Sequence, residues 1–484
     1  MHSRPPRATA CSASRSTRPS RSSVCWSASV SSGTSSSRVP TRSRPSGLRQ
    51  PPARRSRERR TARPPDARPP GPGGAFRSRA STWATAFDRP WTGARRARRI
   101  PGVSSTTLGE RRAVFDVPAD VAYFNTANLS PLLHRVRDAG AEALAQRGRP
   151  WTISSADWFS DVERLRSLFG RLVRADAEGV AIIPATSYGF AVAARNLRVR
   201  EGEAILVLAE EYPSGIYTWR ALARRGGARV LTVAREPGQS WTEAVLGALD
   251  ERIRVVSVPH VHWTDGALLD LEAIADRAHA LGCALVIDAS QSAGALPLDV
   301  GRLRPDFLVS VGYKWLLGPF GLSFLHVARR HRDGEPLEEN WIARAGSEDF
   351  STLTAYRDEY QPGARRFDMG QRTSFHLVAM AIAALEQILT WEVPRIAATL
   401  SETTAVIAAR CAALGLTVAP DAQRGPHMLG AAIPAGTRAS ILPALQDARC
   451  YAAVRGASLR IAPHLHVNSA DVDRLSDALA HATA

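Results

Sequence analysis

The fold is decided by residues 284–321, which read ALVIDASQSAGALPLDVGRLRPDFLVSVGYKWLLGPFG. Two short apolar runs, ALVI and FLVS, predict two buried strands, and polar residues follow each of them. Asp288 ends the first run, and Lys314 comes shortly after the second. Ligands of open parallel sheets bind beyond the carboxyl ends of the strands. We therefore expect Asp288 and Lys314 to lie in one site.

Strands and helices alternate on both sides of this stretch. Buried strands are predicted in VAIIP, AILVLA, RVLTVA and RVVSVP, and amphipathic helices in residues 157–175 and 268–282. This alternation predicts an α/β fold with a mostly parallel sheet that is covered on both faces. We expect a large domain over residues 108–365 and a smaller C-terminal α/β domain over residues 366–484.

The net charge of +18 is concentrated in the first hundred residues. They hold 23 Arg, no Lys and three acids, whereas the remaining residues hold 40 basic and 42 acidic side chains. Attraction to nucleic-acid phosphates would therefore have to come from this segment alone. We expect no nucleic-acid partner for the nearly neutral body.

Residues 1–107 are rich in Arg, Ser and Pro and show no hydrophobic periodicity. Such a composition does not supply a packed core, so we expect this tail to be disordered. Four explanations of the tail stay open: a start codon assigned too far upstream, disorder without function, an organelle transit peptide, and an RNA-binding arm.

The cysteine pattern and the hydropathy of the chain indicate where in the cell the protein is expected. No CxxC pair occurs, so we expect neither a metal site nor a disulfide framework, and the pattern favours a reducing cytoplasm. No run of about 18 apolar residues occurs, so we expect no membrane span. The five cysteines are Cys11, Cys25, Cys283, Cys411 and Cys450.

The chain contains 62 Arg but a single Lys, Lys314. If composition pressure replaces Lys by Arg wherever charge alone matters, a surviving Lys marks a position that Arg cannot serve. Arg stays protonated, whereas Lys can become a neutral amine and form a Schiff base. Chance survival of a surface lysine is the competing explanation. The position of Lys314 after a predicted strand favours the Schiff base.

Polar residues at the ends of other predicted strands suit a ligand that forms a Schiff base with Lys314. Thr186 and Ser187 follow VAIIP at a predicted helix start, where hydroxyl and backbone N–H groups suit a phosphate, although a plain helix cap is the competing explanation. Asp288 suits a pyridinium nitrogen, although it too could be a helix cap. Phosphate donors, a carboxylate and an amine together predict a pyridoxal 5′-phosphate site.

At these residues the chain resembles the class V aminotransferases, fold-type I pyridoxal-phosphate enzymes that include cysteine desulfurases, kynureninases and isopenicillin N epimerases. The resemblance covers about residues 108–480. It implies that Lys314 carries the cofactor, that Asp288 pairs with the ring nitrogen and that Gln291 lies near the ring hydroxyl. It further implies that Tyr212 stacks on the cofactor. The remaining residues that it assigns to cofactor binding are Thr186, Ser187, Ser310 and Tyr313.

The resemblance also implies a substrate site. VRGASLRIAPHLHVN, residues 454–468, is similar to the family segment whose Arg binds the substrate α-carboxylate. Arg460 is the first candidate, Arg455 the second, and Asn128 a further substrate-binding candidate. The sequence departs from the family pattern at His466–Asn468 and at Trp263, which leaves the substrate open.

RFDMGQRTS, residues 366–374, resembles the segment with which a neighbouring subunit completes the phosphate site. Arg372 and Thr373 are the candidates there. The resemblance therefore implies a homodimer with a shared active site.

The predicted lysine, carboxylate and substrate-binding arginine favour transamination of an amino acid. Lys314 would move the α-proton, and Asp288 would sustain the electron sink. A lyase or an epimerase of the same fold needs the same parts and stays open. A cysteine desulfurase that uses its own thiol is disfavoured, because Cys450 lies at a predicted strand start and not in an exposed loop. A non-catalytic relative, or a nucleic-acid-binding protein acting through the basic tail, is the rival from another class.

Overall fold

The computed structural model describes residues 107–434 and 436–483. The predicted tail, residues 1–107, lies outside them except for Thr107, and so do Cys11 and Cys25. None of the described helices has by itself the length and apolar composition of a membrane span. Helices α8 (Phe375–Trp391) and α9 (Val393–Ala413) pass that test only as a pair, bent by 77°.

The large sheet has seven strands in the order β2-β8-β7-β6-β5-β3-β4. Four of its neighbouring pairs are parallel, and β8 runs antiparallel to both of its neighbours. The predicted mostly parallel sheet is therefore confirmed. The strands are β2 (Val180–Ile183), β3 (Ala204–Leu208), β4 (Arg229–Val233), β5 (Ile253–Pro259), β6 (Ala284–Asp288), β7 (Phe307–Val311) and β8 (Ser323–Val327).

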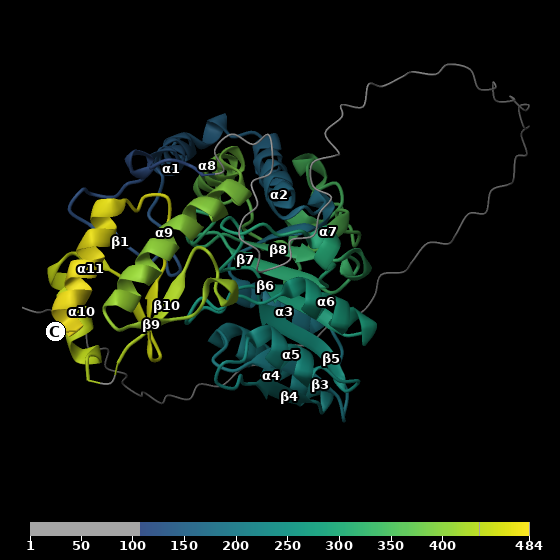
Figure 1. The fold of residues 1–484 in the computed structure, drawn as a ribbon. Coiled ribbons are helices and arrows are strands. Elements are labelled where there is room, and N and C mark those ends of the chain that lie inside the picture. Colours follow the sequence, from purple (N-terminus) through teal and green to yellow (C-terminus); the bar gives the residue numbers. More distant parts are fainter. Residues whose placement is uncertain (1–106, 435, 484) are drawn as a thin grey trace, which may run out of the picture. The chain divides into compact units, whose positions relative to one another are not determined.

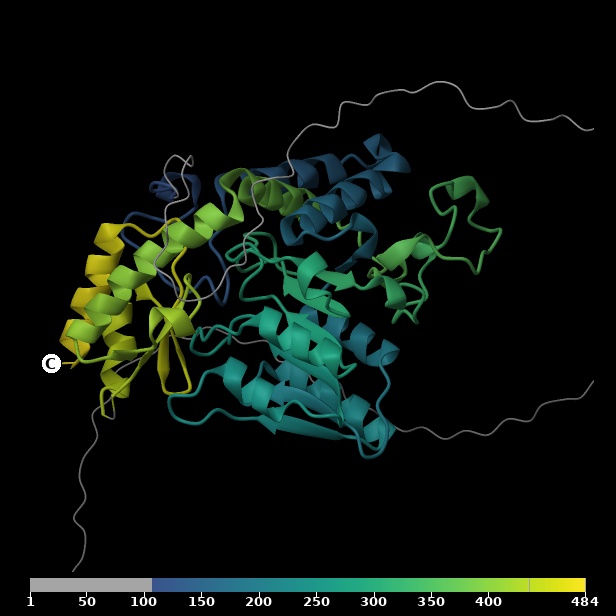
Figure 2. The ribbon, with the colours of Figure 1, turned by 45° about the vertical axis from the view of Figure 1, so that its right-hand side comes forward.

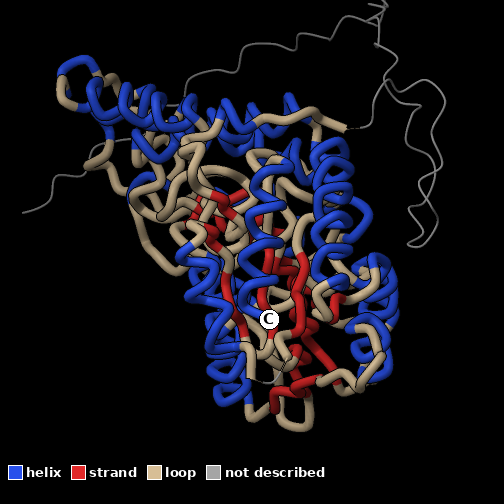
Figure 3. Tube along the Cα trace, turned by 60° about the vertical axis from the view of Figure 1, so that its left-hand side comes forward, coloured by secondary structure: helices blue, strands red, loops and turns tan. Residues whose placement is uncertain are grey.

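Helices cover both faces of this sheet, as the continuous apolar strands predict. In β3, Leu206 belongs to one buried cluster, and Ile205 and Val207 belong to another, because successive side chains point to opposite faces. Figure 3 shows the strands, in red, enclosed by helices, in blue. The first cluster contains residues of α2 (Ser160–Val173), α5 (Trp241–Ala248), α6 (Leu271–Ala280) and α8, and the second contains residues of α3 (Thr186–Asn196) and α4 (Pro213–Gly226).

A four-stranded antiparallel sheet forms the C-terminal part, in the order β12-β13-β10-β9. In Figures 1 and 2 its elements, in light green and yellow, gather apart from the teal elements of the large sheet. Residues of α9, α10 and α11 form a third core with it. Its elements are β9 (Thr417–Val418), β10 (Leu429–Ala432), β12 (Ala453–Arg455), β13 (Ser458–Ile461), α10 (Arg438–Asp447) and α11 (Ser469–Thr483).

The N-terminal segment joins this C-terminal part. Strand β1 (Ala122–Tyr123) pairs in parallel with β11 (Cys450–Tyr451), and Asn125 forms a bridge with Ala462. Helix α1 (His134–Arg147) packs along α8, and the short α7 (Val300–Leu303) lies between β6 and β7 in the sequence. Residues from both ends of the described chain thus contribute to the C-terminal part. The predicted domain boundary at residue 365 stays a prediction.

Candidate active site

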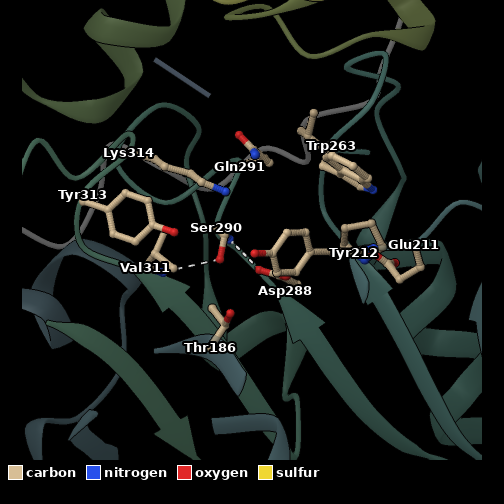
Figure 4. Close-up of a pocket in the computed structure, with 12 residues that line it drawn as sticks. Thr186, Glu211, Tyr212, Trp263, Asp288, Ser290, Gln291, Val311, Tyr313 and Lys314 are labelled. Atoms are coloured by element: carbon tan, nitrogen blue, oxygen red, sulfur yellow. Dashed lines mark hydrogen bonds between the residues drawn. The ribbon is translucent and has the colours of Figure 1, made fainter. Parts of the chain in front are cut away.

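A pocket with about 380 Å³ of empty space lies at the carboxyl ends of five strands of the large sheet. Strands β2, β3, β5, β6 and β7 all end at this edge, because β8 is antiparallel to both β2 and β7. Figure 4 shows Lys314 and Asp288 directed into the same space. The lining residues are Thr186, Glu211, Tyr212, Pro259, Val261, Trp263, Asp288, Ser290, Gln291, Val311, Tyr313 and Lys314.

Lys314 enters the pocket from the turn after β7. The turn begins at Gly312, where an added Cβ would lie 2.5 Å from the carbonyl oxygen of Leu322, so a side chain there would clash with the backbone. Burial lowers the pKa of Lys314 to about 8; the Asp288 carboxylate raises it, and the guanidinium groups of Arg460 and Arg455 lower it further. A substantial fraction of the amine is therefore neutral near pH 8.

Asp288 ends β6, as predicted. One carboxylate oxygen accepts a hydrogen bond from the backbone N–H of Ser290 at 2.8 Å, and the Ser290 hydroxyl accepts one from Val311 N–H at 3.3 Å. Burial raises the pKa of Asp288, whereas the bonds to Ser290 and the charge of Lys314 lower it. Among the described residues no basic side chain forms an ion pair with Asp288, so the carboxylate is available to a cationic ligand atom.

Thr186 and Ser187 form the first turn of α3. The preceding residue, Ala185, provides no side-chain cap, so the first N–H groups of the helix are left for a ligand. Thr186 is buried and lines the pocket, whereas the Ser187 side chain is exposed and is not part of the lining.

Aromatic rings surround the lysine amine. The Nζ atom of Lys314 lies 5.7 Å from the ring centroid of Tyr212 and 5.9 Å from that of Tyr313. The Tyr212 ring meets the ring of Trp263 edge-on, with centroids 5.8 Å apart. Tyr212 and Tyr313 therefore both border the predicted cofactor position.

Gln291 and Ser310, two further predicted cofactor residues, are engaged within the fold. The Gln291 amide donates to the carbonyl oxygen of Ala127 at 3.0 Å and accepts from the indole N–H of Trp315 at 2.8 Å. Gln291 still lines the pocket. Ser310 is buried inside β7, where its hydroxyl donates to the carbonyl of Val311, and it is not part of the lining. Both roles stay predictions.

Arg460 is 1% exposed and lies in β13. Its guanidinium donates to the carbonyl oxygen of Trp263 at 2.8 Å and to Oδ1 of Asn125 at 3.2 Å, and its buried Nε has no partner in the described ranges. The Asn128 side chain is exposed and lines no part of the pocket. The asparagine that touches the candidate arginine is thus Asn125, and substrate binding by Asn128 stays a prediction.

Arg372 and Thr373 point into their own chain. Arg372 is fully buried and forms an ion pair with Asp368 at 2.5 Å, while the hydroxyl of Thr373 donates to the carbonyl oxygen of Trp158 at 2.8 Å. Both side chains are engaged within their own chain, and their role toward a neighbouring subunit stays a prediction. The resemblance of residues 366–374 to the family segment did not indicate that Arg372 forms a buried ion pair with Asp368 of the same chain.

Six pocket residues were not predicted as site residues, and three of them carry polar side-chain atoms: Glu211, Trp263 and Ser290. Burial raises the pKa of Glu211 to about 7, although the N–H of Tyr212 donates to its carboxylate and lowers the pKa. Glu211 follows β3, so its position at a strand end was the signal that could have identified it. Trp263 was visible only as a departure from the family pattern.

The side chains and backbone groups at the pocket fit pyridoxal 5′-phosphate. The start of α3 offers N–H donors to a phosphate, Asp288 offers a carboxylate to a pyridinium nitrogen, and Lys314 offers an amine to an aldehyde. Tyr212 and Tyr313 flank the space between them. Within the described ranges no group of three or more His, Cys, Asp or Glu side chains is placed to hold a metal ion.

Comparisons with known proteins agree with this site. The sequence model of the family "Aminotransferase class-V" matches residues 125–474. The chain therefore belongs to the class V aminotransferase family, and its cofactor is pyridoxal 5′-phosphate.

Named relatives differ in their reactions. The chain is 32% identical over 287 residues to a kynureninase of Deinococcus radiodurans, which covers 57% of this chain and 68% of that protein. It is 30% identical over 211 residues to the isopenicillin N epimerase of Streptomyces clavuligerus, covering 42% of this chain and about half (52%) of the epimerase.

Solved structures support the fold. A C-DES mutant with glycine covalently linked to the PLP cofactor superposes with a TM-score of 0.69 at 20% identity, over 76% of this chain and 99% of that chain. The apo cysteine desulfurase from Thermococcus onnurineus gives a TM-score of 0.66 at 17% identity, over 76% and 96%. The predicted fold-type I architecture is confirmed.

Proposed function

We propose that this enzyme transaminates an α-amino acid and that Lys314 carries the α-proton. The observation behind this proposal is the position of the single lysine of the chain, which enters the pocket opposite Asp288 with a pKa of about 8. A general base works best when its pKa lies near the working pH.

Pyridoxal 5′-phosphate, when bound, supplies an aldehyde for the substrate amine and a ring that withdraws electrons from the α-carbon. Asp288 would keep the ring nitrogen protonated, because its carboxylate is half-buried and has no competing ion pair among the described residues. The N–H groups at the start of α3 would bind the phosphate, and Tyr212 would stack on the ring. Lys314, released as a neutral amine, would take the α-proton and deliver it to the acceptor carbon of the cofactor.

A lyase of the kynureninase type is the second candidate. The observation that favours it is the 32% identity to a kynureninase over 68% of that protein. A cysteine desulfurase that uses its own thiol is less well supported, because the described cysteines, Cys283, Cys411 and Cys450, are buried. Burial raises the pKa of Cys450 to about 12, which opposes formation of a reactive thiolate.

Single-turnover measurements with a panel of amino acids test the proposal. Transamination predicts conversion of the bound aldehyde cofactor into its amine form, which a 2-oxo acid then reverses. Release of alanine, pyruvate, ammonia or sulfide without the amine form would reject transamination and favour a lyase. A homodimer in the cytoplasm belongs to the same proposal, and sedimentation of the purified protein tests the dimer.

A further inference from the structure

Two arginines project from one face of the β12–β13 hairpin beside the pocket. In this antiparallel pair Ala453 lies opposite Arg460, and Arg455 lies opposite Ser458. Residues directly opposite each other, and residues two apart on one strand, share a face of a sheet. Arg455 and Arg460 therefore extend from the same face and are diagonal neighbours, because Arg455 lies opposite Ser458, two residues before Arg460.

Both guanidinium groups act on the catalytic lysine and on each other. The charges of Arg460 and Arg455 each lower the pKa of Lys314, and burial and the charge of Arg455 lower the pKa of Arg460 to about 10. Neither arginine forms an ion pair with an acid among the residues that the structure describes. Neither arginine is part of the pocket lining, but both contact Trp263, which is. The Trp263 end of the pocket therefore borders two guanidinium groups that have no ion-paired acid among the described residues.

Trp263 lies between the two arginines. Its carbonyl oxygen accepts the bond from Nη1 of Arg460 at 2.8 Å, and its ring lies 6.0 Å from the guanidinium carbon of Arg455. The indole N–H donates to the carbonyl oxygen of Glu210 at 2.7 Å, which fixes the ring. Arg455 itself donates only to the neighbouring carbonyl of Val454, at 2.9 Å, among the described groups, so most of its donors stay available.

The cofactor phosphate does not account for both charges. Thr186, at the start of the helix that suits the phosphate, lies well apart from Trp263 in Figure 4. A substrate α-carboxylate supplies one negative charge, enough for one guanidinium. The other guanidinium, that of the half-buried Arg455, is then left without an anionic partner among the described residues.

We propose that Arg455 binds an anionic group on the side chain of the substrate, so that the enzyme prefers acidic α-amino acids of the aspartate and glutamate class. The proposal rests on the proposed function, because it takes Arg460 as the partner of the α-carboxylate. Trp263 is a positioning residue that holds the Arg455 guanidinium over its ring.

Equilibrium binding to the holoenzyme tests this proposal. Amino acids are mixed with the protein in a stopped-flow cell, and the dissociation constant is taken from the first, rapid change in the cofactor absorbance spectrum, before the amine form accumulates. Glutamate is compared with glutamine, and aspartate with asparagine, because each amide has nearly the shape of its acid without the charge. The wild-type protein should bind each acid at least about tenfold more tightly than its amide, the size expected for a charge-assisted bidentate bond.

Arg455→Gln should weaken binding of the two acids about tenfold or more and leave the amides within about twofold. Arg455→Lys keeps the positive charge but loses the two parallel N–H donors of the guanidinium. It should therefore recover part of the preference for acids over amides. Arg410→Gln is the matched control, since Arg410 forms an exposed ion pair with Asp473 in the same C-terminal part, and it should bind like the wild type.

Two results would overturn the proposal. One is a wild-type protein that binds acids and amides equally well, which needs no variant and no folding control. The other is an Arg455→Gln protein, folded by circular dichroism, in which acids and amides lose affinity equally, since this would make Arg455 a second partner of the α-carboxylate. Neither result depends on whether the amine form of the cofactor appears, so failure of transamination is recognised separately.

Discussion

Burial shifts the pKa values of Asp288 and Lys314 in opposite directions. The charge of each residue opposes the effect that burial has on the pKa of its partner. Burial raises the pKa of Asp288 and lowers that of Lys314 to about 8, whereas the carboxylate raises the pKa of the amine and the ammonium lowers that of the carboxyl. Pairing of Asp288 with a cationic ring nitrogen would hold the carboxylate in its charged form. The two residues therefore supply a base and a stable negative charge near neutral pH.

The pKa of Lys314 can be measured directly, because the chain has one lysine. Protein freed of cofactor and treated with trinitrobenzenesulfonate should react at Lys314 with a midpoint near pH 8, since only the neutral amine reacts. Asp288→Asn removes the charge that raises this pKa, so the midpoint should move below that of the wild type. Peptide mapping separates Lys314 from the terminal amine.

A wild-type midpoint near the ordinary lysine value of 10.5 would contradict this description of the site. Arg410→Gln, far from any role in the pocket, serves as the control and should keep the wild-type midpoint.

Asp288→Asn should also lower turnover by about 100-fold, a cost typical of removing one preorganised electrostatic contact. The cofactor should still bind, because the phosphate contacts and Lys314 are unchanged. Steady-state kinetics and the cofactor absorbance measure the two effects separately. Turnover close to that of the wild type would show that Asp288 is a structural residue.

Asp368 is predicted to be the main electrostatic contributor to stability near the site. Its buried carboxylate accepts hydrogen bonds from Arg166 at 2.8 and 3.1 Å and from the backbone of Ile182 at 2.7 Å, and it pairs with Arg372. Asp368→Asn leaves buried Arg372 without a counter-charge and leaves buried Arg166 with the partly exposed Glu163 alone, so the free energy of unfolding should fall by about 3–5 kcal/mol. Urea unfolding measures the loss, and Arg410→Gln should cost less than about 1 kcal/mol.

The same carboxylate predicts acid sensitivity. Burial alone would raise the pKa of Asp368, but Arg166 and Arg372 hold it below its ordinary value of 3.8. A lowered folded pKa contributes stability that is fully present above pH 3.8 and is lost as the pH falls through the folded value. The Asn variant should lack this component, so its stability should vary less with pH below about 4. An equal pH dependence in the two proteins would contradict the assignment.

Much of the large sheet could be predicted, because each strand is a short apolar run that ends in a turn or a polar residue. Asp288, Thr186 and Lys314 lie at strand ends, and parallel strands bring their carboxyl ends to one edge. Their meeting in one pocket therefore followed from topology alone.

Other parts of the site depend on contacts between distant segments. Asn125 meets Arg460 only because β1 pairs with β11 in the C-terminal part, and a two-residue strand carries no periodic signal. Arg372 looked available in the sequence because nothing local indicates its partner Asp368 or the burial of both. In a chain with 62 Arg, the sequence could not separate arginines used inside the fold from those that face a ligand.

Residues 1–100 are predicted to be dispensable. The segment offers no apolar periodicity for packing, so its deletion should leave the melting temperature and the activity nearly unchanged. A clear loss of either would mean that the segment stabilises the enzyme. Salt-dependent binding of nucleic acid that disappears with the deletion would instead revive the RNA-binding explanation.

Borohydride reduction of the purified protein shows whether Lys314 holds the cofactor. Reduction should fix the chromophore covalently, and mass spectrometry of the digest should locate it on the peptide that contains Lys314. Lys314→Arg should yield no reducible covalent cofactor, because Arg cannot form a Schiff base. A reduced cofactor found on another residue, or retained by Lys314→Arg, would show that Lys314 does not carry the cofactor.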